Sequence, residues 1–145
     1  MSQLGWQQNP DTRKSCNKEL APLVGLDESI ELWTNAFTYG ISFDILEPDD
    51  PIFENVPNPY DTGVPYMTTP YPNPWPVTTG EILANATAWA GMWKEGAIVK
   101  NYNLTQGYRG VYFSHYIEDQ EAGSNIQDKQ VYYNALIWTA GEVGG

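Results

Sequence analysis

Nine of the eleven prolines in this chain fall between residues 48 and 76. Proline fixes the backbone φ angle and has no amide proton, so this segment cannot supply a helix or the centre of a sheet. Its aromatic residues argue against disorder, because disordered segments are poor in them. We therefore expect residues 48–76 to form a long, ordered, extended loop that wraps the domain or crosses to another subunit. Such a loop is usually functional.

Alternation of side-chain types predicts strands on both sides of the proline-rich segment. Along residues 30–46, one face collects the large apolar side chains, which are Trp33, Phe37, Tyr39, Ile41, Phe43 and Ile45. A period of two is that of a β-strand. The run is long for one strand, so we expect a bulge or bend near Asn35 or Gly40. Further strands are expected at 97–104, 108–117 and 130–139. The last two carry apolar side chains on both faces, as strands covered from both sides do.

A single helix is predicted over residues 78–95. Thr78 and Glu81 have the spacing of an N-terminal capping box, and Gly96 stands where a helix-ending glycine is common. Between these signals, an apolar stripe recurs at helical intervals and consists of Ile82, Ala86, Trp89, Ala90, Trp93 and Ala97. We expect Trp89 and Trp93 to pack in the core or at an interface.

The length of 145 residues is typical of one domain. Ten Tyr, six Trp, 13 Gly and 11 Pro describe a turn-rich β protein better than a helical bundle. We predict a mainly β fold, an antiparallel sandwich or barrel-like sheet, with an N-terminal arm at 1–18 and a single β-rich domain at 19–145. The first residues lack the apolar core of a signal peptide, and no apolar run has the length of a membrane span.

The formal net charge of −11 is unevenly distributed. Between Glu19 and Trp93 there are eleven carboxylates and no Lys or Arg. Such a surface repels nucleic acids and anionic membranes, whose binding depends on basic residues. It favours solubility, and it also suits docking onto a basic partner or binding of a hard cation. The densest acidic cluster is a candidate calcium site, although its spacing is not that of an EF-hand loop and a solvated acidic turn is the competing interpretation. It consists of Asp44, Glu47, Asp49 and Asp50.

Residues able to carry out catalysis are scarce. One histidine, His115, and one cysteine, Cys16, are too few ligands for a zinc site, and a single thiol cannot form an internal disulfide. Ser114 adjoins His115, but neighbours in a strand point to opposite faces, so they cannot act as nucleophile and base. No nucleotide-binding or metalloprotease motif occurs. We therefore expect neither enzymatic activity nor a cofactor.

The C-terminal region is predicted to combine a strand, an acidic loop and a second strand. The first strand is Gly110-Val-Tyr-Phe-Ser-His-Tyr-Ile-Glu-Asp119, and the second is Val131-Tyr-Tyr-Asn-Ala-Leu-Ile-Trp138. In this order of elements, the region from Gly80 to the end resembles the small head-decoration (cement) proteins of tailed phages. The resemblance covers under half of the chain. It implies a trimer that clamps neighbouring capsid subunits.

These features predict a structural subunit of a phage particle, either a capsid decoration protein or a tail or fibre component, located in the virion after assembly in the host cytoplasm. Its expected partners are other copies of itself and a capsid or tail protein. The candidate interface residues are the aromatic ones, a type enriched at interfaces: Phe53, Tyr60, Tyr66, Tyr71, Trp75, Trp89 and Trp93. The alternative is a carbohydrate-binding β module that stacks sugars on exposed rings such as Trp75, Tyr71 and Tyr60. Where these rings point distinguishes the two functions.

Overall fold

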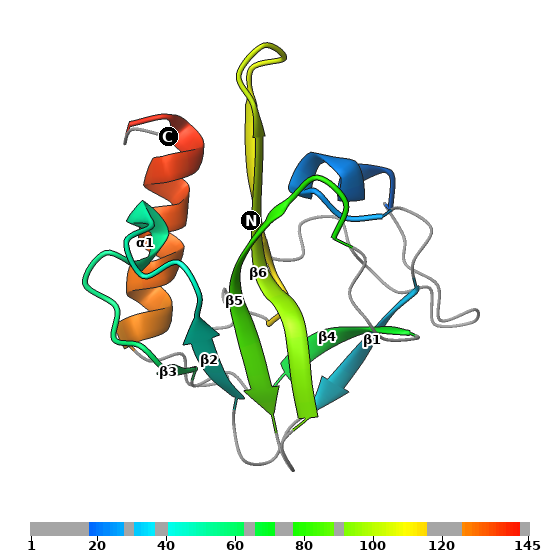
Figure 1. The fold of residues 1–145 in the computed structure, drawn as a ribbon, viewed down its shortest axis with the longest axis vertical. Helices are drawn as coiled ribbons and strands as arrows, with labels where there is room; N and C mark the ends of the chain where they lie inside the picture. The colour runs from blue at the N-terminus through cyan, green and yellow to red at the C-terminus, as the bar shows by residue number, and fades with distance from the viewer. Residues whose placement is uncertain are drawn as a thin grey trace.

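The computed structural model describes residues 18–27, 31–36, 41–62, 66–71, 77–88, 92–115 and 126–142. These residues form a mainly antiparallel β fold with a single α-helix, which confirms the predicted fold class (Figure 1). The larger sheet has the order β3 (Tyr60–Thr62), β2 (Ile41–Ile45), β5 (Glu81–Ala88), β6 (Met92–Asn103) and β7 (Tyr108–Phe113). Strands β1 (Glu31–Ala36) and β4 (Tyr66–Tyr71) form a separate two-stranded sheet. The other elements are the helix α1 (Ile126–Ala140) and the 3-10 turns η1 (Lys18–Val24) and η2 (Pro51–Phe53).

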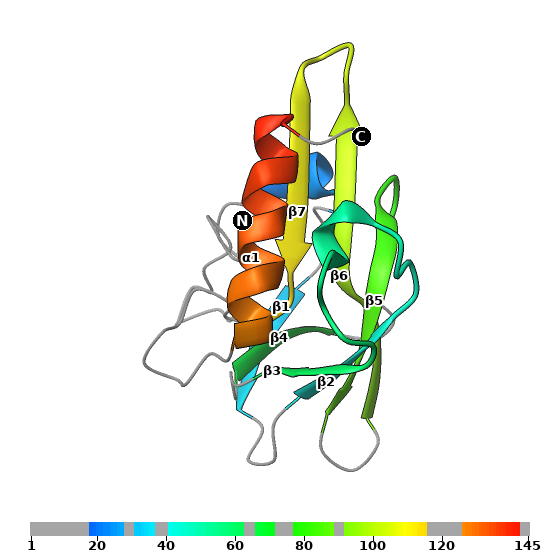
Figure 2. The same cartoon turned by 90° about the vertical axis from the view of Figure 1, so that its left-hand side faces the viewer.

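The larger sheet is strongly curled, and β2 and β3 are turned steeply relative to β6 and β7 (Figure 2). The pairing between β5 and β6 is irregular, and its register shifts twice between Ile82 and Ala86. There the side-chain oxygen of Asn85 accepts the amide proton of Gly96 at 3.1 Å, and Gly96 has a positive φ of 69°. Irregularities of this kind bend a strand and increase its twist. The sheet is therefore a half-barrel rather than a flat layer.

Helix α1 and the turn η2 cover one face of this sheet. Alternate strand residues point to that face, as Ile41, Phe43 and Ile45 do in β2. They form one continuous apolar core with side chains from α1 and η2. The buried residues of this core are Ile41, Phe43, Ile45, Ile52, Phe53, Tyr60, Leu83, Ala84, Ala86, Ala97, Ile98, Val111, Phe113, Val131, Ala135 and Trp138.

The turn η1 covers the opposite face of β6 and β7. Val99 and Tyr112 point to that side and pack with Ala21 and Leu26 in a second, smaller apolar cluster. The strand predicted at 108–117 was expected to have a helix on one face and another sheet or a subunit on the other. Strand β7 does have α1 on one face, but the turn η1 of the same chain covers the other.

The segment after η1 crosses the start of β5 at very short range. Gly25 has a positive φ of 77°, and a Cβ built on it would lie 2.2 Å from the Cα of Gly80. The carbonyl oxygen of Gly25 accepts hydrogen bonds from the backbone amide and the hydroxyl of Thr78, at 2.8 and 3.1 Å. Only residues without a Cβ fit this crossing, which holds η1 against the sheet.

The predicted helix over 78–95 is wrong, because its described residues form β5 and the start of β6. The hydroxyl of Thr78, expected to cap a helix, instead bonds to Gly25, and Gly96, expected to end the helix, lies within β6. Strand β5 is hydrogen-bonded on both sides, to β2 and to β6, and its Ala84 and Ala86 are fully buried. These tertiary contacts outweigh the local helix preference of an alanine-rich segment.

The predicted strand over 130–139 is also wrong, because these residues belong to α1. In this segment both sets of alternate residues are apolar, so the pattern does not distinguish a strand covered on both faces from a helix. The helix ends in a Schellman motif at Gly141, whose φ is 81°. The amide of Gly141 donates to the carbonyl of Trp138 at 3.0 Å, and that of Glu142 donates to Ile137 at 3.3 Å. The resemblance to head-decoration proteins therefore loses the second of its two strands.

The other expected elements agree where they are described. The strands predicted at 97–104 and 108–117 correspond to β6 and β7, with 116–117 outside the described residues. The run 30–46 divides into β1 and β2, which belong to different sheets. Residues 37–40 lie outside the description, so the form of the predicted bend stays a prediction. The described part of the chain contains no helix long and apolar enough to cross a membrane.

The proline-rich segment 48–76 is described only in part. It contains η2, β3 and β4, and β3 lies at an edge of the larger sheet, where a proline-rich chain is tolerated. Residues 63–65 and 72–76 are outside the description, so the course of the whole loop stays a prediction. The predicted arm also lies outside it, except for Lys18, with which η1 begins.

Candidate interaction surface

One face of helix α1 packs into the main core. Val131, Ala135 and Trp138 recur at i, i+4 and i+7 and are at most 1% exposed. The Trp138 ring meets the ring of Tyr102 edge-on, with centroids 6.2 Å apart. Its closest cation is the guanidinium of Arg109, 5.4 Å from the ring centroid. Trp138 is therefore the largest of the fully buried side chains on the inner face of α1.

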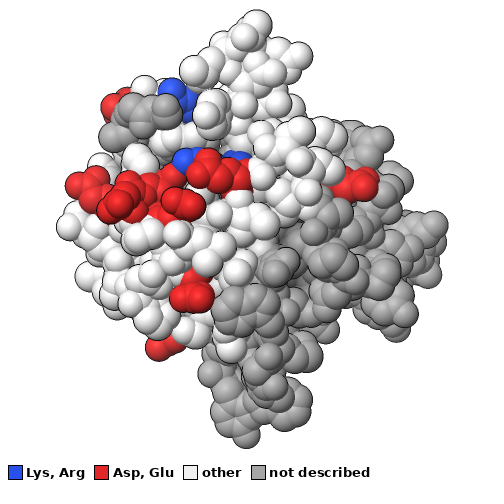
Figure 3. Space-filling view, viewed as in Figure 1, with Lys and Arg blue, Asp and Glu red and all other residues white. Residues whose placement is uncertain are grey.

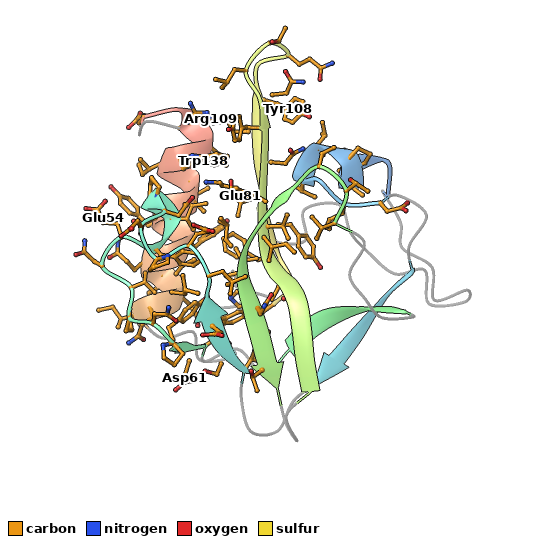
Figure 4. The ribbon with its side chains drawn as sticks, in the orientation of Figure 1. Glu54, Asp61, Glu81, Tyr108, Arg109 and Trp138 are labelled. Atoms are coloured by element: carbon orange, nitrogen blue, oxygen red, sulfur yellow. The ribbon has the colours of Figure 1, made fainter. Side chains whose placement is uncertain are left out.

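Cations from β6 and β7 surround this anchor. Arg109 donates a hydrogen bond to the carbonyl oxygen of Trp138 at 3.1 Å, and Figure 4 shows the two residues together near the C-terminal end of α1. A cation is favourable at this end of a helix, where backbone carbonyls lack helical partners. Lys100 lies 5.8 Å from the Trp138 centroid and forms ion pairs with Asp50 and, at 3.3 Å, with Glu81. Burial alone would lower the pKa of Lys100, but its hydrogen bond to Asp50 and the two carboxylate charges raise it.

Two buried polar groups anchor the inner face of α1 at other points. Near its N-terminus, Asp128 accepts a hydrogen bond from the hydroxyl of Thr62 at 2.8 Å, and its other oxygen lies 3.5 Å from Nε2 of His115. In the middle of the helix, the amide group of Asn134 donates to the carbonyls of Ile52 and Glu54, at 3.1 and 2.9 Å. These bonds join α1 to β3 and η2.

The single histidine is a core residue. The ring of His115 is 0% exposed, with the ring of Phe43 at 4.5 Å and that of Phe113 at 5.8 Å between centroids. Tyr60 is also buried in this region. Burial raises the pKa of its phenol well above the usual value, and the nearby charge of Asp128 raises it further. His115 has no surface through which it could meet a substrate in this conformation.

The opposite face of α1 is also apolar, and it faces solvent. Ile126 is 77% exposed, Tyr133 60% and Leu136 43%. Their positions at i, i+7 and i+10 place them on one side of the helix, together with Lys129 and the half-buried Ile137. We call these five residues the outer stripe. A helix that is apolar on both faces is typical of one that is covered on both faces.

The outer stripe contains no acid, in contrast to the surface around it. Where side chains are described, the exposed acids outnumber the exposed bases by seven to one, because Lys129 is the one exposed base. Figure 3 shows acidic groups gathered on the side of the molecule where α1 and η2 lie. Glu54 is among them (Figure 4), and its own carbonyl is bonded to Asn134 of α1. The exposed acids are Asp44, Glu47, Asp49, Glu54, Asp61, Glu81 and Glu142.

The aromatic residues predicted as an interface do not form one surface among the described residues. Phe53 and Tyr60 are 2% and 1% exposed and belong to the core, so in this conformation they can neither contact another subunit nor stack on a sugar. Tyr66 and Tyr71 lie in β4 and Trp93 in β6, but their side chains are not described. Trp75 and Trp89 lie outside the described residues.

The four acids considered for calcium do not converge. Asp44, Glu47 and Asp49 are exposed, whereas Asp50 is buried, caps η2 by accepting the amide proton of Ile52 at 3.0 Å, and pairs with Lys100. In the described part of the chain, no group of three or more His, Cys, Asp or Glu side chains could hold a metal ion.

Comparison with models of known protein families and with curated proteins finds no match to this sequence. Function therefore has to be inferred from the surfaces of the chain itself.

Proposed function

We propose that this chain is a non-enzymatic structural subunit of a larger assembly, and that it contributes the outer stripe of α1 to a subunit contact. The observation that carries the proposal is the two-sided apolar character of α1. The inner face is buried in the core, whereas Ile126, Tyr133 and Leu136 leave a second apolar face exposed. Exposed apolar groups gathered on one element mark interaction sites, while single ones are common on any surface.

The particle of a tailed phage is the assembly that we propose, with other copies of the chain and a capsid or tail protein as partners. Support for the virion comes from the first strand of the sequence resemblance, of which residues 110–113 lie in β7. The second segment, 131–138, is helical and gives no support. Support for a structural role is the burial of His115. For the alternative of a carbohydrate-binding module, the described residues add no support, because Tyr60 is buried.

Sedimentation of a native extract tests the proposal. The chain, tagged and expressed in its natural host, should sediment with a large particle, far ahead of a free 16.3 kDa protein. Substitution of Tyr133 and Leu136 by Ser should shift it to the position of the free monomer, because both side chains are exposed and neither contributes to the core. A matched control replaces Leu104, exposed on the β6–β7 hairpin, and Leu23, exposed on η1, by Ser. Sedimentation of the wild-type chain as a monomer would refute the proposed function.

A further inference from the structure

We infer that the outer stripe of α1 docks a different protein whose surface combines an apolar ridge with Lys or Arg residues, rather than a second copy of this chain. This inference rests on the proposed function and specifies the partner for the same surface. It is carried by the charge of the stripe and of its surroundings.

The stripe offers an apolar centre bordered by acid. Tyr133 lies at its middle, and Asn134, the next residue, is hydrogen-bonded to the backbone of Glu54. Glu54 is exposed at the end of η2, and the exposed Asp49 precedes that turn. Both hydrogen bonds of Asn134 hold η2 against α1, and the exposed carboxylates that flank η2 belong to the acidic side of the molecule on which α1 lies (Figure 3).

A second copy would bring the same acids to the contact. In a twofold contact each copy presents the same patch. When the two α1 helices pair antiparallel, with the twofold axis perpendicular to them, the acidic side of one copy faces the acidic side of the other. The net charge of −11 per chain adds a general repulsion between copies. Like charges placed opposite each other across an interface suppress that pairing.

A partner with Lys or Arg on one side of an apolar ridge fits this surface when its basic side chains face η2 and not Lys129, the exposed base of the stripe. Its apolar ridge covers Ile126, Tyr133 and Leu136, and its Lys or Arg side chains meet the acids along η2. Tyrosine is enriched among residues that dominate binding energy. Complementary charge speeds association and selects the partner, and its contribution falls as salt is added.

Two designed peptides of the same length, roughly 18 residues, serve as defined probes: one has an amphipathic helix of Leu and Lys, and the other replaces every Lys by Glu. Binding of each fluorescently labelled peptide to the full chain is measured by anisotropy. We expect the Leu/Lys peptide to bind and the Leu/Glu peptide to bind at least about tenfold more weakly. Raising the salt from about 50 to about 300 mM should weaken the Leu/Lys complex.

Variants of the chain locate the site. Tyr133→Ser should weaken binding about tenfold. Leu104→Ser, at an exposed apolar residue on the β6–β7 hairpin, should leave it unchanged. Replacing Asp49 and Glu54 by Asn and Gln should weaken binding and flatten its salt dependence. Asp44→Asn is the matched control, because Asp44 is exposed on β2 and alternates with core residues, so it lies on the sheet face away from α1. Circular dichroism of each variant verifies folding.

Three outcomes would overturn the inference. Equal binding of the two peptides, or binding unaffected by Tyr133→Ser, would show that the stripe and its acids do not select a basic partner. A dimer of the pure chain that Tyr133→Ser dissociates, measured by light scattering, would assign the stripe to a second copy. Carbodiimide crosslinks between Glu54 and Lys14 in monomeric protein would assign it to the N-terminal segment of the same chain. In each case the native-extract sedimentation can still succeed, so failure of the inference is distinguishable from failure of the proposed function.

Discussion

Truncating Trp138 measures how firmly α1 is docked. Its side chain is 1% exposed and lies in the main core. Replacing a buried aromatic residue by Ala lowers the free energy of unfolding by about 3–5 kcal/mol. Loss of the ring near Arg109 and Lys100 removes two cation–π contacts, each worth about 0.5–1 kcal/mol where partly exposed. We therefore expect Trp138→Ala to reach the upper part of this range, which is a large fraction of a typical total stability of about 5–15 kcal/mol.

Tyr133→Ala is the matched comparison, because the same helix carries this aromatic residue 60% exposed. A substitution at such an exposed position should change the free energy of unfolding by no more than about 0.5 kcal/mol. Both variants are unfolded in urea and followed by far-UV circular dichroism, in which the signal comes mainly from the backbone and not from the deleted tryptophan. If Trp138→Ala prevents folding, Trp138→Phe, which keeps a ring, should give a measurable and smaller loss. Equal losses at Trp138 and Tyr133 would refute the assignment of the inner and outer faces.

Three further predictions test other contacts. Asp50→Ala removes both the cap of η2 and the ion-pair partner of Lys100, so it should lower the free energy of unfolding by about 1–3 kcal/mol in urea. The loss should exceed that of Asp50→Asn, which removes the charge but keeps the cap; equal losses would mean that the cap contributes nothing. The pKa of Tyr60 is raised in the folded state, so the stability that its protonated phenol contributes is intact below about pH 10, the pKa of an unfolded tyrosine, and is lost as the pH rises further. In thermal melts, Tyr60→Phe should therefore reduce the fall in melting temperature at alkaline pH. An unchanged fall would contradict this. Gly107→Ala should lower the free energy of unfolding by about 1–2 kcal/mol, because only the left-handed backbone conformation opposes it and nothing lies within 4 Å of the added Cβ. In Gly25→Ala the added Cβ would also lie 2.2 Å from a backbone atom, so the melting temperature should fall further. Equal melting temperatures would argue against the close crossing.

The parts of the fold that were predictable share a strong period of two. Ile41, Phe43 and Ile45 alternate with more polar residues because one face of β2 is buried, and the structure places all three in the core. In β7, apolar residues on both faces correctly indicated a strand covered from both sides. His115 was predictable as a packed residue because a lone histidine in an apolar strand pattern is usually packed or hydrogen-bonded, and the ring is 0% exposed.

Helix and strand were exchanged where the apolar pattern fitted both. Residues 78–95 had helix-like end signals, but Thr78 and Gly96 serve contacts to Gly25 and Asn85 that local sequence does not reveal. In the C-terminal segment, the helical spacing of the residues that become the inner face of α1, followed by Gly141, was a signal for a helix. Because that segment was interpreted as a strand, its outer stripe could not be predicted as a surface.

Long-range polar contacts left no trace in the sequence pattern. Thr62 and Asp128 are 66 residues apart, and Asp50 and Lys100 are 50 apart. A periodic pattern reports which face of an element is buried, not which element covers it. The positions of the anchors that fix α1 therefore depend on the tertiary fold alone.

Hydrophobic burial by itself does not decide which face of α1 turns inward, because both faces carry large apolar side chains. The polar residues decide it. With the observed face inward, Asp128 bonds to Thr62, and Asn134 satisfies two backbone carbonyls of the η2 region. With the helix turned over, Lys129 would be buried, and the carbonyls of Ile52 and Glu54 would lose the donor that Asn134 supplies; an unsatisfied buried polar group costs about 1–3 kcal/mol. Buried hydrogen bonds therefore select one orientation of a helix that apolar packing leaves ambiguous, and the face left outside is the apolar one that a partner can cover.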